Sequence, residues 1–71
     1  MAKAVVWCVP GHATSSGYNE VLWAKDGDLN KASRRGDKKR FIYNRTGWQR
    51  AKEFARVKAK QLGVKASIHP W

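Results

Sequence analysis

Cysteine, acidic residues and long apolar runs are scarce in this chain, and each shortage excludes a class of protein. A single cysteine, Cys8, excludes an internal disulfide and is typical of a reducing compartment. No apolar run approaches the roughly 18 residues of a membrane span, and the apolar residues near the start are too few for a secretory signal. We therefore expect a cytoplasmic protein without a membrane span. Its 71 residues predict one small domain.

The shortage of acids is the most informative of the three. Five Asp and Glu residues stand against fifteen Lys and Arg, which gives a formal net charge of +10. The segment from Arg34 to Lys65 holds twelve of the bases and only two acids, Asp37 and Glu53, so it accounts for the whole net charge. Uncompensated positive charge favours an anionic partner, most commonly nucleic acid. The alternative is a strongly basic surface without a dedicated partner.

The small number of acidic residues also means that few carboxylates are present to act as catalytic groups or metal ligands. No Ser/His/Asp or Cys/His arrangement of a nucleophile is legible, so we expect neither enzymatic activity nor a cofactor. A structural zinc site usually needs four ligands, and only Cys8, His12 and His69 are candidates. We predict no metal site and expect Cys8, in an apolar strand, to be a small core residue.

Three segments have the β-branched and aromatic composition of strands: residues 3–9, 19–25 and 38–44. The first is apolar on both faces, which indicates a strand inside a sheet. Residues 28–37 show no apolar periodicity and predict a mobile loop. Residues 65–69 offer an optional fourth strand.

The clearest expected element is a helix from Thr46 to a C-terminal cap at Gly63. Thr46 and Gln49 have the spacing of a capping box. One apolar stripe of this helix comprises Trp48, Ala51, Ala55, Ala59 and Leu62. The sequence therefore predicts one α+β domain over residues 1–71. Its three-stranded antiparallel sheet is packed by one C-terminal helix (βββα).

The third strand leaves two arrangements open, because Lys39, Phe41 and Tyr43 alternate with Arg40, Ile42 and Asn44. If the aromatic set faces water, it forms a platform on which bases can stack. If it packs beneath the helix, Arg40 and Asn44 face solvent and can contact phosphates or base edges. Packing of Phe41 in the core is the favoured arrangement.

Four tryptophans are many for so short a chain. Trp7, Trp23 and Trp48 fit the core of a small domain that needs large apolar side chains. Trp71 follows Pro70 and has no periodic reason to be buried. It either folds back over the sheet edge or forms an exposed contact, and both alternatives stay open.

The leading hypothesis is a small DNA- or RNA-binding protein with modest sequence specificity. Segment 34–40 is expected to be a turn between strands whose side chains spread along a phosphate backbone, and the outer face of the helix continues the contact. The candidate residues are Arg34, Arg35, Lys38, Lys39, Arg40, Arg45, Arg50, Arg56 and Lys60, with Tyr43 and Trp71 as aromatic contacts. The rival is a protein-binding module that docks on an acidic surface of a larger enzyme, with charge steering the encounter.

Several short motifs resemble a family of short uncharacterised bacterial and phage proteins. The motifs are Trp7-x-Val9-Pro10, Trp23-Ala24-x-Asp26-Gly27, the alanine-rich helix and Ile68-His69. The chain departs from that pattern in a longer loop at 10–18 and a more basic segment at 34–45. The resemblance implies the fold but no activity. The compactness and basicity of the chain and its lack of catalytic residues suit a phage-encoded accessory protein, such as one that docks on a host enzyme.

The predicted order of three strands and a helix is also similar to the arm-binding domains of tyrosine integrases and to plant-type AP2 domains. These domains place a three-stranded sheet in the DNA major groove. The similarity is one of architecture alone. It would imply DNA contacts around Trp23, Lys25, Arg35, Lys38 and Arg40.

Overall fold

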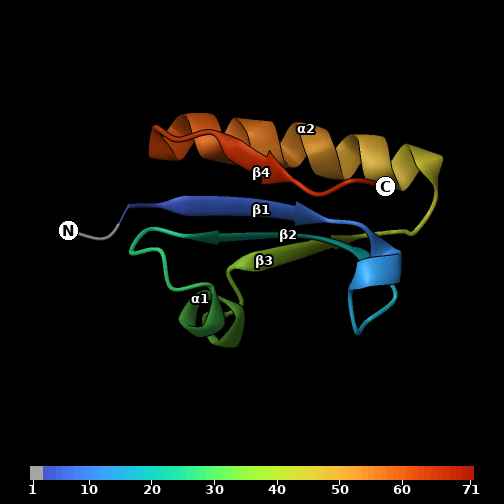
Figure 1. Cartoon of the computed structure of the whole chain (residues 1–71), viewed down its shortest axis with the longest axis horizontal. Helices are drawn as coiled ribbons and strands as arrows, with labels where there is room; N and C mark the ends of the chain where they lie inside the picture. Colours follow the sequence, from blue (N-terminus) through green and yellow to red (C-terminus); the bar gives the residue numbers. More distant parts are fainter. Residues whose placement is uncertain (1–2) are drawn as a thin grey trace.

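The computed structural model of the chain describes residues 3–71, which form an α+β fold, as predicted. Seven elements follow one another along the chain (Figure 1). They are β1 (Val5–Val9), the 3-10 turn η1 (Gly11–Ala13), β2 (Asn19–Ala24), α1 (Leu29–Arg35), β3 (Lys38–Phe41), α2 (Arg45–Leu62) and β4 (Ala66–Ile68). No helix in this part of the chain is both long and apolar enough to cross a membrane.

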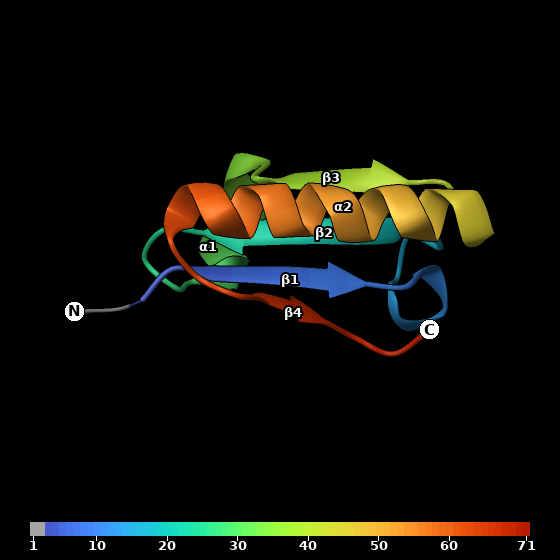
Figure 2. The same ribbon diagram turned by 90° about the horizontal axis from the view of Figure 1, so that it is seen from above.

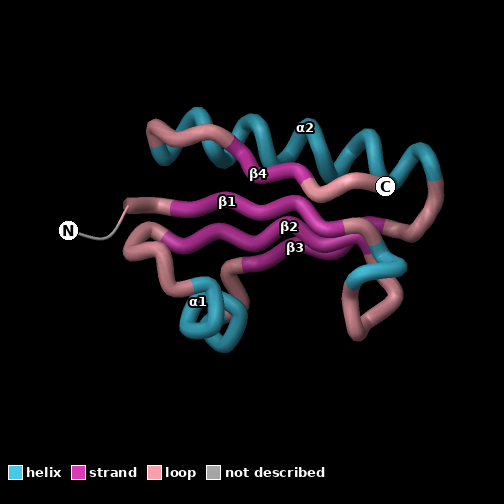
Figure 3. Tube along the Cα trace, viewed as in Figure 1, coloured by secondary structure: helices cyan, strands magenta, loops and turns pink. Residues whose placement is uncertain are grey.

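The four strands form one mixed sheet in the order β3-β2-β1-β4, drawn in magenta in Figure 3. The β1–β2 and β2–β3 pairs are antiparallel, which confirms the expected three-stranded antiparallel arrangement. The optional fourth strand forms as β4 and pairs in parallel with β1, because α2 carries the chain back along the sheet. The strand β1 therefore lies inside the sheet, as its two apolar faces predicted.

The helix α2 covers one face of the sheet and lies across its middle, with β3 beyond one flank and β4 beyond the other (Figure 2). Its alanines Ala51 and Ala55 are fully buried against Val6, Cys8 and Val21 of β1 and β2. Small side chains on the helix allow this close approach to the sheet. The predicted apolar stripe of α2 is therefore confirmed.

The start of α2 differs from the prediction. The helix begins at Arg45, and its cap is Asn44, whose Oδ1 accepts a hydrogen bond of 2.7 Å from the backbone N–H of Gly47. Thr46 lies inside the first turn, so the expected capping box does not form. Asparagine is as good a cap as threonine. The strand β3 stops earlier than predicted, at Phe41, which pairs with Asn19, the first residue of β2. The expected C-terminal cap at Gly63 is confirmed, with φ 71°.

Residues 28–37 do not form the expected mobile loop, because α1 occupies most of them. The Oδ1 of Asp28 caps this helix by accepting a hydrogen bond of 3.1 Å from the backbone N–H of Lys31, and Gly36 ends it with φ 87°. Ala32 is the one buried residue of α1, which explains why the sequence shows no apolar period there. The helix lies on the side of the sheet opposite α2 (Figure 1), so the fold has two helices rather than one.

A buried amide connects three segments at one end of the sheet. Asn19 is fully buried at the start of β2. Its Oδ1 accepts a hydrogen bond of 2.7 Å from the N–H of Gly11 in η1. Its Nδ2 donates a hydrogen bond of 2.9 Å to the carbonyl of Ile42, between β3 and α2. Asn19 thereby holds η1 against the segment that enters α2.

Candidate nucleic-acid interface

The helix α2 carries much of the positive charge and almost no compensation for it. Its 18 residues include a single acid, Glu53, and six bases. The two ion pairs found in residues 3–71 are Arg35–Asp37 and Arg40–Glu20, and neither involves α2. The six bases of α2 are Arg45, Arg50, Lys52, Arg56, Lys58 and Lys60.

Three of these bases lie on one flank of α2. Phe54 marks the opposite flank, since its ring centroid lies 5.8 Å from that of Phe41 on the β3 side of the sheet. At about 100° per residue, Lys52, Arg56 and Lys60 fall on the flank beside β4. Their spacing of four residues corresponds to a rise of about 6 Å between neighbours. We call Lys52, Arg56 and Lys60 the basic strip.

Four rings gather at the N-terminal end of the basic strip, and we call them the aromatic cluster. The ring centroid of Trp71 lies 5.0 Å from that of Tyr43 and 5.3 Å from that of Trp48. The fourth ring, His12, lies 6.1 Å from Tyr43 and 6.3 Å from Trp71. Trp48 is 7% exposed, whereas Tyr43 and Trp71 are 43% and 52% exposed. The cluster therefore has a buried base and an accessible top.

Both alternatives predicted for Trp71 are realised in part. Its chain folds back, but onto Trp48 and Tyr43, and the residue stays half-exposed. The Nε2–H of His12 donates a hydrogen bond of 2.7 Å to the backbone carbonyl of Trp71, which fixes that end of the chain on η1. An open groove of about 620 Å³ lies beside it, lined by Arg45, Trp48, Gln49 and Trp71.

The bases of segment 34–40 occupy a different part of the surface, and they do not form the expected turn between strands. Arg34 and Arg35 belong to α1, and residues 38–40 belong to β3 at the sheet edge farthest from β4. Several of these side chains are engaged within the chain. Arg35 pairs with Asp37 and Arg40 with Glu20, each at 3.1 Å.

Lys38 and Lys39 are also held by neighbours. The Nζ of Lys38 lies 3.4 Å from the Oγ of Ser33, and that of Lys39 lies 5.2 Å from the ring centroid of Phe54. Phe41 packs beneath α2, as favoured, so Arg40 faces the other side of the sheet. Segment 34–40 thus lies in α1 and the edge strand β3, whereas the basic strip lies on the flank of α2 beside β4.

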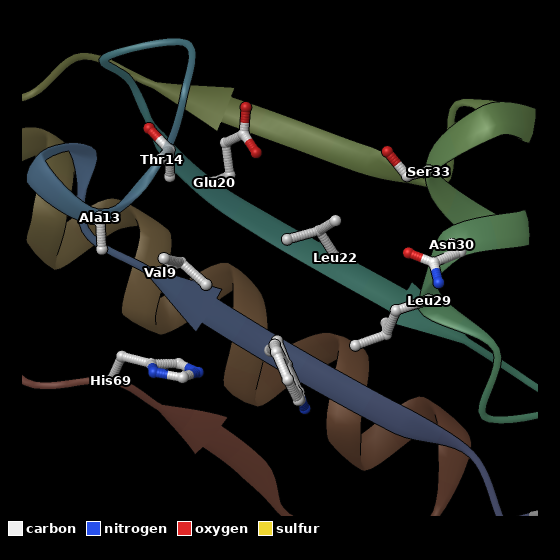
Figure 4. A pocket seen from close by; sticks show the side chains of 10 residues that line it. Val9, Ala13, Thr14, Glu20, Leu22, Leu29, Asn30, Ser33 and His69 are labelled. Carbon is white, nitrogen blue, oxygen red and sulfur yellow. The ribbon is translucent and has the colours of Figure 1, made fainter.

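The face of the sheet away from α2 is partly open. Trp7 lies there and is 40% exposed, so its predicted place in the core is wrong. The alternation of β1 that buries Val6 and Cys8 under α2 turns Trp7 to the other side. A groove of about 410 Å³ lies on this face. Val9, Leu22 and Leu29 are among the side chains that line it (Figure 4). This groove forms a second accessible apolar surface.

Cys8 and His69 point to opposite faces of the sheet. Cys8 is buried under α2, and burial raises the pKa of its thiol to about 11, although the nearby cations Lys52 and Arg56 oppose the rise. The ring of His69 lies 5.2 Å from that of Trp7 on the open face. Within residues 3–71, no three His, Cys, Asp or Glu side chains lie together as metal ligands would.

The structure brings together the predicted residues Arg45, Tyr43 and Trp71, and it adds three that sequence reasoning missed. The additional residues are His12, Trp48 and Lys52. One feature of the sequence could have identified Lys52, namely its four-residue spacing from Arg56 and, in turn, from Lys60. No such feature could have identified the contacts of His12, since its partners lie at least 31 positions away.

No protein-family model, curated protein or solved structure matches this chain. The resemblance to the short bacterial and phage family remains a prediction. So does the architectural similarity to integrase arm-binding and AP2 domains. A function is therefore inferred from the side chains of this structure.

Proposed function

We propose that this protein binds nucleic acid by contacting phosphates along the basic strip. The observation that carries the proposal is the unpaired charge of α2, whose six bases include no member of an ion pair within the described residues. Arg56 and Lys60 are exposed, and Lys52 is half-buried beside them. Such cations displace condensed counterions from a polyanion, which favours binding.

The proposed contacts do not distinguish one sequence from another. Phosphates are the same at every position, so a surface of lysines and arginines fixes the position of a nucleic acid without reading its bases. We therefore expect modest sequence specificity. The proposed role requires no catalytic step and no cofactor, and the free thiol of Cys8 suits a cytoplasmic location.

Salt dependence tests the proposal directly. Fluorescence anisotropy would follow labelled single-stranded DNA, duplex DNA and RNA between about 50 and 200 mM salt. We expect log affinity to fall linearly with log salt, with a slope of about 0.9 per phosphate contact on duplex DNA. Absence of binding at the lowest salt would refute the proposal.

Two triple variants with equal loss of charge locate the contact. Replacing Lys52, Arg56 and Lys60 by alanine should reduce the slope on duplex DNA by roughly 2.7. The matched control replaces Arg34, Arg35 and Lys38, which lie in α1, on the face of the sheet away from α2, and in the edge strand β3. We expect the control to retain most of the slope. Equal reductions of the salt slope in both variants would mean that binding depends on the overall charge rather than on the basic strip.

A second candidate function is protein docking on the open face of the sheet, and the groove beside half-exposed Trp7 favours it. Lys38 lies on the same face, in register with Leu22, and its charge would attract an acidic protein there, whereas Arg40 is paired with Glu20. Docking through this surface would suit a phage-encoded protein that modulates a host enzyme. Replacing Trp7 by alanine would abolish docking but leave nucleic-acid binding intact.

A further inference from the structure

We infer that the aromatic cluster stacks unpaired bases, so that the preferred ligand is a single-stranded nucleic acid. This inference rests on the proposed nucleic-acid binding and names its ligand class. Single-strand sites combine cations that follow the backbone with aromatic rings on which bases stack. The basic strip and the aromatic cluster supply these two parts on adjoining surfaces.

The aromatic cluster is held in place before any ligand arrives. The Trp71 ring rests against buried Trp48 at 5.3 Å and against Tyr43 at 5.0 Å. Its backbone carbonyl accepts the hydrogen bond from His12. With these contacts in place, Trp71 as a whole residue is still 52% exposed. A ring ordered in advance loses little conformational entropy when a base stacks on it.

Cations lie beside the aromatic cluster, where the phosphates next to a base stacked on Trp71 would lie. Arg45 and Gln49 line the same groove as Trp48 and Trp71. The Nζ of Lys52 lies 5.8 Å from the ring centroid of Trp48, which places the first member of the basic strip against the cluster. A strand that stacks a base on Trp71 can therefore pass Arg45 and continue along the basic strip.

Base pairing decides which nucleic acid can use both parts. In a duplex the bases stack on one another and their faces are covered, so the duplex offers the protein mainly its phosphates. Unpaired bases can turn out and stack on an aromatic side chain. Stacking is tolerant of base identity, which agrees with the modest sequence specificity proposed above.

The first experiment changes the ligand and leaves the protein intact. Wild-type protein would be titrated by anisotropy with labelled oligothymidylate and with an abasic oligonucleotide of equal length, which has the same phosphates and no bases. We expect the abasic ligand to bind at least about fivefold more weakly at equal salt, since each stacked base contributes roughly that factor or more. The salt slopes of the two ligands should agree, because their phosphates do.

The second experiment removes the ring. Trp71→Leu should weaken oligothymidylate binding by about fivefold or more and leave abasic binding unchanged. Trp71→Phe keeps an aromatic surface and should restore most of the affinity. The matched control is Trp7→Leu, a half-exposed tryptophan on the opposite face, which should bind both ligands as the wild type does. Circular dichroism of each variant checks that it is folded.

The outcomes separate the two ideas. Salt-dependent binding that is equal for oligothymidylate and the abasic ligand would overturn base stacking and leave phosphate binding standing. A Trp71→Leu variant that is folded and binds oligothymidylate normally would overturn the place of stacking. If the wild type binds no nucleic acid at about 50 mM salt, both base stacking and phosphate binding are refuted. The exposed rings would then be tested as a binding surface for a protein partner.

Discussion

At the residue scale, one buried amide determines whether the aromatic cluster can assemble. Asn19 connects η1, which carries His12, to the segment that carries Tyr43. Because all of its hydrogen-bonding partners are backbone groups, the contact does not depend on neighbouring side chains. A polar side chain buried in this way stabilises the fold only while both partners are present.

We predict that Asn19→Ala lowers the free energy of unfolding by roughly 1–3 kcal/mol, because it leaves the N–H of Gly11 without its acceptor and removes one of the two donors to the carbonyl of Ile42, the other being the N–H of Asn44. Urea denaturation followed by circular dichroism would measure the loss. The matched control is Asn30→Ala, at an exposed position of α1, which should change stability by less than about 0.5 kcal/mol. Similar values for the two variants would contradict this role of Asn19.

Cys8 makes stability depend on alkaline pH. Burial raises the pKa of its thiol from 9.0 to about 11 in the folded protein, so the unfolded chain releases this proton first as pH rises. Stability should therefore fall between about pH 9 and pH 11. We predict that the wild type loses about 1–2 kcal/mol more than Cys8→Ala between about pH 8 and pH 10.5, measured by urea denaturation. Equal losses would show that Cys8 does not contribute.

At the element scale, the first turn of α2 shows a conflict between helix propensity and packing. Alanine is preferred over glycine inside a helix by about 1 kcal/mol. A Cβ added at Gly47, however, would lie 1.9 Å from the carbonyl oxygen of Ile42, which is a backbone atom. The entry into α2 must shift if this side chain is to fit.

We predict that Gly47→Ala destabilises the protein by about 2 kcal/mol or more, against the sign of helix propensity. Thermal denaturation would measure the change. The control is Gln49→Ala, an exposed position two residues on in the same helix, which should be nearly neutral. A stabilised Gly47→Ala variant would mean that the chain relaxes at Ile42 without cost.

At the scale of the whole molecule, the net charge of +10 opposes folding, because 71 residues must hold their cations close together. Salt screens this repulsion, with a Debye length that falls from about 10 Å at 0.1 M to about 3 Å at 1 M. We predict that the Tm rises with sodium chloride over that range. The triple variant of the basic strip should show a smaller rise. A Tm that is independent of salt would contradict self-repulsion.

Much of the fold could be predicted because its signals are local. The β-branched and aromatic composition identified β1 and β2, and the four-residue alanine step identified α2 and its buried stripe. The sequence did not predict the helix α1, because a helix of seven residues that buries a single alanine has almost no apolar periodicity. Trp7 was misplaced for a related reason, since two apolar faces of a strand do not indicate which one a single helix covers.

The sequence by itself determined the α+β class and the concentration of charge in the second half of the chain, because composition and periodicity are properties of neighbouring residues. Only the tertiary structure decided which cations remain unpaired and which rings meet. The ion pair Arg40–Glu20 depends on strand register, and the contacts of His12 with Trp71 join residues that are 59 positions apart. Pairing and clustering require distant segments to be brought together, and the sheet and the buried Asn19 bring them together here.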